Sequence, residues 1–130
     1  MNTKRIVRVR GAISCCLGCP YDGEVKPEAV GYVARLMHDI GVQHVGVADT
    51  IGVGVPTQVT ELVASVREAV PGVALRCHFH NTRNTGLANA FAAVQAGVWT
   101  LDASLGGIGG CPFAPAATGN IPTEDLVYLL

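Results

Sequence analysis

Residues 73–80 read VALRCHFH, an apolar run that ends in two histidines, and this stretch decides how the chain folds. Side chains alternate between the two faces of a β-strand, so His78 and His80 point to one side while Phe79 points to the other. The run therefore predicts a strand that carries two imidazoles on one face at its carboxyl end. Two imidazoles on one face are suited to hold a metal ion.

The stretches on either side repeat one pattern, a short apolar strand followed by an amphipathic helix. We expect strands at 5–14, 44–48, 73–79 and 98–103, and helices at 27–40, 56–70, 84–96 and from 123 onward. In the second helix we expect Val59, Leu62, Val63 and Val66 on the buried face. In the third helix we expect Phe91 in the buried stripe, and we expect Thr123 to be the N-cap of the fourth. Strands that alternate with helices predict an α/β fold with a parallel sheet.

Composition favours a single cytoplasmic domain of 130 residues, 49% of them hydrophobic and 15% charged. The net charge of -1 gives no reason to expect nucleic acid as a partner, and charged residues interrupt every apolar run before it reaches the length of a membrane span. The amino terminus lacks the long apolar segment of a signal peptide. Five cysteines without a secretory signal indicate reduced thiols.

Residues that could take part in catalysis or metal binding cluster where the predicted strands end. Asp49 follows the second strand, and His80 ends the third. Cys111 follows a glycine-rich stretch, residues 106–110, that could close over a substrate. Because parallel α/β sheets build their sites at the carboxyl ends of strands, we expect one site there.

Two of these features keep alternative interpretations. Asp49 is either a general base or a cap that binds the backbone amides of the following loop. Cys15, Cys16 and Cys19 contain a C-x-x-C pair that is typical of zinc sites, although no second pair follows.

Several motifs together resemble the 3-hydroxy-3-methylglutaryl-CoA lyases, members of the TIM-barrel metallolyases. The similarity runs from Val9 to Leu130 in the order of that family, and it is most specific in the Gly-Gly-Cys-Pro loop with the downstream Gly-Asn. The motifs are CLGCPYDG at 16–23, DTIGVG at 49–54, HFHNT at 78–82, GIGGCP at 107–112, GN at 119–120 and TED at 123–125.

This resemblance implies a partial (β/α)8 TIM barrel, with residues 1–130 as an incomplete C-terminal half that supplies the last four βα units. It implies that His78, His80 and Asn120 bind a divalent Mg²⁺ or Mn²⁺ ion. Asp49 would be a catalytic acid/base residue, and Cys111 the thiol that takes part in proton transfer.

The implied reaction is the metal-assisted retro-Claisen cleavage of a 3-hydroxy-acyl-CoA to acetyl-CoA and a keto acid such as acetoacetate. In the family, that chemistry belongs to leucine degradation and ketone body formation. Alternatives are a related acyl synthase or aldolase, or a non-catalytic metal-binding half-barrel that forms oligomers.

The first strand of the family carries an Arg-Asp pair whose Asp is a further metal ligand, and this chain has no such motif. Three neutral ligands predict weak metal affinity, and we expect the isolated chain to be inactive. The sequence ends in the apolar segment 126–130, within an unfinished helix. We therefore expect a homo-oligomer, or association with a missing N-terminal half-barrel, in addition to an acyl-CoA substrate.

Overall fold

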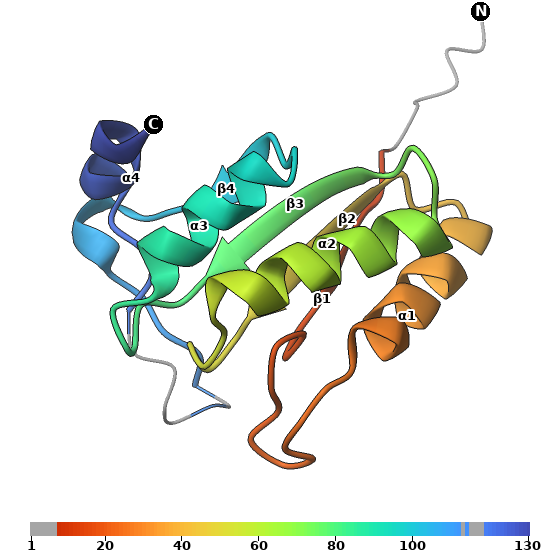
Figure 1. The fold of residues 1–130 in the computed structure, drawn as a ribbon, viewed down its shortest axis with the longest axis horizontal. Coiled ribbons are helices and arrows are strands. Elements are labelled where there is room, and N and C mark those ends of the chain that lie inside the picture. Colours follow the sequence, from red (N-terminus) through yellow and green to blue (C-terminus); the bar gives the residue numbers. More distant parts are fainter. Residues whose placement is uncertain (1–7, 113, 115–118) are drawn as a thin grey trace, which may run out of the picture.

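A computed structural model of the chain describes residues 8–112, 114 and 119–130. Residues 5–7 of the expected first strand, Phe113 after the glycine-rich loop, and residues 115–118 lie outside this range. The elements, labelled in Figure 1, are β1 (Arg10–Ile13), α1 (Pro27–Asp39), β2 (His44–Asp49), α2 (Pro56–Ala69), β3 (Ala74–Phe79), α3 (Gly86–Gln95), β4 (Thr100–Asp102), the short 3-10 helix η1 (Leu105–Gly107) and α4 (Thr123–Leu129).

The strands form one parallel sheet in the order β1-β2-β3-β4. Its register places Asp49 beside Phe79 and His78 beside Asp102, so the carboxyl ends of neighbouring strands are level. This topology confirms the predicted α/β class with a parallel sheet, because each crossover between neighbouring strands contains a helix.

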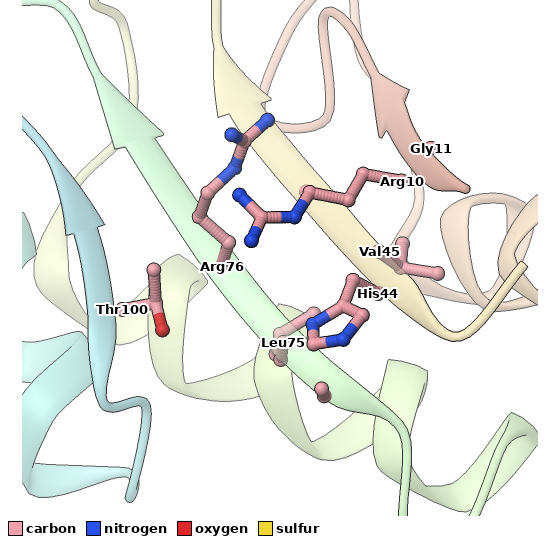
Figure 2. Close-up of a pocket in the computed structure, with 9 residues that line it drawn as sticks. Arg10, Gly11, His44, Val45, Leu75, Arg76 and Thr100 are labelled. Atoms are coloured by element: carbon pink, nitrogen blue, oxygen red, sulfur yellow. The ribbon is translucent and has the colours of Figure 1, made fainter. Parts of the chain in front are cut away.

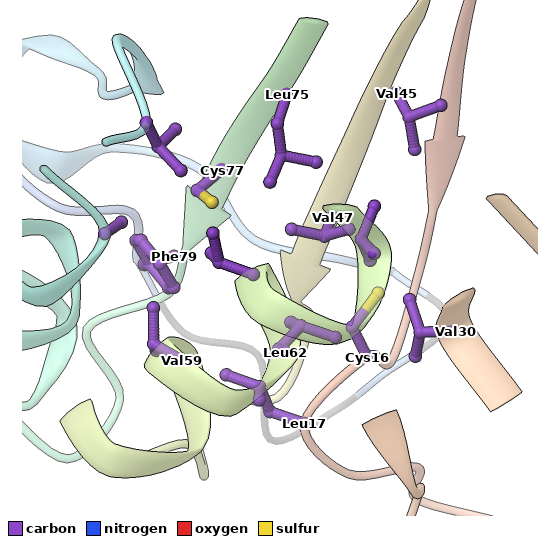
Figure 3. Packing of buried hydrophobic residues seen from close by; sticks show 14 of the residues in the cluster. Cys16, Leu17, Val30, Val45, Val47, Val59, Leu62, Leu75, Cys77 and Phe79 are labelled. Carbon is purple, nitrogen blue, oxygen red and sulfur yellow. The ribbon is translucent and has the colours of Figure 1, made fainter. Parts of the chain in front are cut away.

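Helices α1, α2 and α3 cover one face of the sheet (Figure 1). Apolar side chains from alternate strand positions meet the helices there, as Figure 3 shows around Phe79, which is 2% exposed. The predicted stripe of α2 is confirmed, since all four of its residues are buried. The core includes Val45, Val47, Val59, Leu62, Val63, Val66, Leu75 and Cys77.

Two expected details are wrong. Phe91 is 44% exposed, because α3 turns its small residues Ala90 and Ala93 toward the core and packs closely. Thr123 is the first residue of α4 and Pro122 is its N-cap, because the first hydrogen bond of the helix runs from the Leu126 amide to the carbonyl oxygen of Pro122.

The opposite face of the sheet carries the other half of the alternating side chains, among them Arg76 and His78. This face is open along two cavities, one toward each end of the strands. Among the residues that the structure describes, no helix has the length and apolar character needed to cross a bilayer.

Candidate functional site

A cleft of about 470 Å³ lies on the open face near the carboxyl ends of the strands. The strands bring polar side chains to it from the face that the helices do not cover. The cleft is lined by Ala12, Ser14, Gly46, Val47, Ala48, Thr50, Arg76, His78, His80, Asp102, Gly110, Cys111 and Pro112.

His78 and His80 share this cleft, as the strand alternation predicts. Their ring centroids are 5.1 Å apart with an interplanar angle of 66°. Phe79 between them points into the core on the other face. The two imidazoles are therefore close enough to act on one bound species.

His80 is 4% exposed, and its Nδ1 atom is buried without a hydrogen-bond partner among the described residues. Burial, together with the neighbouring His78, lowers the pKa of His80 below its ordinary value. The lowered pKa favours the neutral imidazole, which is the form that binds metal ions.

Asn120 is joined to His80 through the backbone, because the two residues form an isolated antiparallel bridge. The Asn120 amide nitrogen Nδ2 donates to the carbonyl oxygen of Ile108 at 3.0 Å. Its Oδ1 atom is buried and lacks a hydrogen-bond partner within the described part of the chain. Asn120 adjoins the cleft and is not among its lining residues.

Cys111 lines the cleft from the loop after η1 and is partly exposed. Glycines at 106, 107 and 109 have φ between +61° and +113°, conformations that other residues adopt rarely. These glycines let the loop turn back over the strand ends, which brings the thiol to the same cleft as the two histidines.

Asp49 lies outside the cleft lining and is 1% exposed. Its Oδ1 accepts the amide of Val53 at 3.1 Å, and its Oδ2 accepts the amide of Gly54 at 2.9 Å. Burial raises the pKa of Asp49, and these backbone hydrogen bonds oppose that rise. The carboxylate therefore caps the loop that joins β2 to α2, which is one of the two interpretations open from the sequence.

The cysteines near the amino terminus do not assemble a zinc site. Within residues 8–112, 114 and 119–130, no group of three or more His, Cys, Asp or Glu side chains could hold a metal ion. Cys16 is buried, its Sγ donates to the carbonyl oxygen of Ile13, and desolvation raises its pKa to about 12. The zinc interpretation is thus not supported by the geometry.

The donor set of His78, His80 and Asn120 does fit a divalent cation. His80 Nδ1 and Asn120 Oδ1 are polar atoms left without hydrogen-bond partners in the described structure, on residues that the backbone bridge sets side by side. Buried polar atoms are normally satisfied, so such pairs point to a ligand. Imidazole nitrogens suit transition-metal ions and an amide oxygen suits Mg²⁺ or Mn²⁺, so the mixed donor set is open to a divalent cation such as Mn²⁺.

Sequence reasoning missed two cleft residues, Arg76 and Asp102. The Asp102 Oδ2 atom lies 3.5 Å from Arg76 Nε and 3.4 Å from His78 Nδ1. The sequence contained a signal for both residues. Arg76 lies two positions before His78 and so points to the same face of the strand, and Asp102 lies at the end of the next strand.

The fold and the cleft define a parallel α/β protein with a polar site at the carboxyl ends of its strands. The chain belongs to the HMGL-like family, whose pattern matches residues 3–130. It is 55% identical over 118 residues to the (R)-citramalyl-CoA lyase of Chloroflexus aurantiacus, covering 91% of this chain and 37% of that protein.

Two further relatives are hydroxymethylglutaryl-CoA lyases. That of Pseudomonas mevalonii is 48% identical over 124 residues, which cover 95% of this chain and 41% of that protein. The crystal structure of the enzyme from Pseudomonas aeruginosa superposes with a TM-score of 0.88 at 48% identity, covering 95% of this chain and 41% of that one.

The chain thus spans about two fifths of the length of these relatives. The comparisons support the TIM-barrel lyase family that the motifs indicated. They do not support the expected assignment to the C-terminal half. They give the share of each relative that the chain covers, and they do not identify which barrel units the chain supplies.

Proposed function

We propose that this chain forms the metal-binding and thiol-bearing part of a lyase that cleaves a 3-hydroxy-acyl-CoA to acetyl-CoA and a keto acid. The observation that carries the proposal is the convergence of His78, His80 and Cys111 on one cleft, with the unpartnered Oδ1 of Asn120 beside it. The relatives named as lyases of citramalyl-CoA and hydroxymethylglutaryl-CoA support the same reaction class.

In this proposal His78, His80 and Asn120 hold Mg²⁺ or Mn²⁺. The bound ion supplies Lewis-acid polarisation of the hydroxyl and carboxylate oxygens of the substrate. The side chains of the protein bind and orient the substrate. The cleft of about 470 Å³ holds the branched acyl part of the substrate and orients the carbon–carbon bond that breaks.

Cleavage requires the tertiary hydroxyl to lose its proton to a base, for which Asp49 is our prediction, while the carbon–carbon bond breaks toward the thioester. The electron pair passes to the acetyl-CoA fragment, whose α-carbon then takes up a proton. In this proposal the thiol of Cys111, which lines the cleft, delivers that proton.

Asp49 remains our prediction for the acid/base residue beside the substrate. Its raised pKa supports such a role, because a carboxyl that titrates nearer neutrality exchanges protons more readily. Its two backbone hydrogen bonds support a second task, which is to shape residues 49–54.

A second candidate is a metal-binding unit that acts only together with another polypeptide. One observation favours it: the floor of the cleft is a single open sheet face, and the three proposed ligands are all neutral. Completion by further strands, from a second copy or another chain, would cover this face and add charged ligands.

The test is calorimetric titration of the full 130-residue chain with Mn²⁺, followed by cleavage assays with hydroxymethylglutaryl-CoA and citramalyl-CoA. We expect binding that His80→Ala and Asn120→Ala each abolish, while His38→Ala, a change on the exposed surface of α1, leaves it intact. Equal affinity in all four proteins would refute the metal site. Cleavage by the chain alone would refute the second candidate.

A further inference from the structure

Asp102 lies between two side chains of the neighbouring strand. The register of β3 and β4 pairs His78 directly with Asp102, and both side chains point to the open face. The Asp102 Oδ2 atom is 3.4 Å from His78 Nδ1 and 3.5 Å from Arg76 Nε. One carboxylate oxygen therefore faces both an imidazole nitrogen and a guanidinium.

The position of Arg76 depends on a glycine in the strand on its other side. A Cβ atom at Gly46 would lie 3.0 Å from the Arg76 terminal nitrogen Nη2 and 3.2 Å from Nε. The bare backbone of β2 thus leaves room for the guanidinium to lie against the sheet, and Figure 2 shows the side chain extending over this face. Strands β2, β3 and β4 together therefore position Asp102 between Arg76 and His78.

A neutral imidazole carries its proton on one ring nitrogen and a lone pair on the other. A carboxylate that faces Nδ1 stabilises the Nδ1–H form, since an acceptor opposite a lone pair would be repelled. The lone pair then resides on Nε2, the nitrogen that Asp102 does not face. Residues that orient a metal-binding histidine in this way are common partners of such sites.

We propose that Asp102 is a positioning residue that holds the proton of His78 on Nδ1 and directs the Nε2 lone pair to a cation in the cleft. Arg76 restrains the carboxylate from its other side. The role in cation binding rests on the proposed function, whereas the tautomer of His78 does not depend on a bound ion.

The test measures the tautomer in the metal-free, ¹⁵N-labelled chain by long-range ¹H–¹⁵N spectra at about pH 8.5, where an ordinary imidazole is neutral. His78→Gln assigns the signal. We expect the Nδ1–H form in the native protein and a shift toward Nε2–H in Asp102→Ala. Asp102→Asn, whose amide oxygen can still accept the proton, should retain most of the Nδ1–H form.

Affinity for Mn²⁺ gives the second readout. We expect Asp102→Ala to weaken binding at least about tenfold, with partial rescue in Asp102→Asn. Asp39→Ala, at the exposed end of α1, is the matched control and should change neither readout. If Asp102 were itself a ligand, Asp102→Asn would lose affinity as severely as the alanine variant while keeping the tautomer.

The Nε2–H form of His78 in the native protein would overturn the proposal, and that spectrum decides the matter even if a variant fails to fold. An unchanged tautomer in a folded Asp102→Ala would also overturn it. Failure of the native chain to bind Mn²⁺ would refute the proposed function instead, and the spectra would still decide the role of Asp102.

Discussion

The backbones of His80 and Asn120 pair in an antiparallel bridge, which sets an imidazole from the end of β3 beside a carboxamide that precedes α4. The hydrogen bond from the Asn81 amide to the Gly119 carbonyl oxygen, at 3.1 Å, belongs to this bridge and holds the two segments together. The bridge matters because both side chains keep a buried polar atom without a partner in the described structure. A cation placed between them would satisfy both atoms.

Gly109→Ala should weaken Mn²⁺ binding. A Cβ atom at Gly109 would lie 2.8 Å from Asn120 Nδ2, so the carboxamide must shift from its present position. Gly106→Ala is the control, because Gly106 also has a positive φ but its Cβ would meet nothing within 4 Å. We expect both variants to lose about 1 kcal/mol of stability from backbone strain. Equal Mn²⁺ affinity of the two variants by calorimetry would show that the Asn120 carboxamide is not a ligand.

Asp49→Ala should lower the free energy of unfolding by about 2 kcal/mol, because two backbone amides lose their acceptor. Asp49→Asn keeps one acceptor oxygen and should cost less. Urea denaturation at pH 7 measures both values. Indistinguishable stabilities of the native chain and the alanine variant would mean that these hydrogen bonds do not shape the loop.

Asp49 also predicts a pH dependence of stability. Its folded-state pKa is raised above the ordinary 3.8, so between these two values the folded chain binds the proton more tightly than the unfolded chain. The contribution of Asp49 is therefore fully present below pH 3.8 and is lost as pH rises through the folded-state pKa. We expect Asp49→Asn to remove this decline in denaturation curves measured from pH 4 upward. If the stability of Asp49→Asn falls with pH as it does in the native chain, a group other than Asp49 causes the decline.

Thiol labelling should separate the cysteines. Burial raises the pKa of Cys16 and of Cys77 to about 12, which leaves roughly one thiolate in ten thousand at pH 8. Cys111 is partly exposed in the cleft, so we expect iodoacetamide to modify it well before these two. Peptide mass spectrometry over time gives the rates, with Cys111→Ser as the control. Labelling of Cys111 as slow as that of Cys77 would argue against its role as a proton donor.

Local sequence patterns were sufficient to predict the helices and strands and to place the two histidines of the site. The alternation in 73–80 placed His78 and His80 on one face and Phe79 on the other, and the structure agrees. The helix stripe was correct for α2, where large apolar residues mark the buried face. It was wrong for α3, where small residues face the core and Phe91 does not.

The sequence by itself determined the α/β class and the end of the sheet at which polar groups gather, because side-chain periodicity and parallel strand direction follow from the backbone. Only the tertiary structure decided that Asp102 faces His78, that Asn120 adjoins His80, and that Asp49 turns toward its own loop. These relationships depend on register between strands and on the path of a long loop. Packing of the whole sheet sets both, and no short stretch of sequence encodes them.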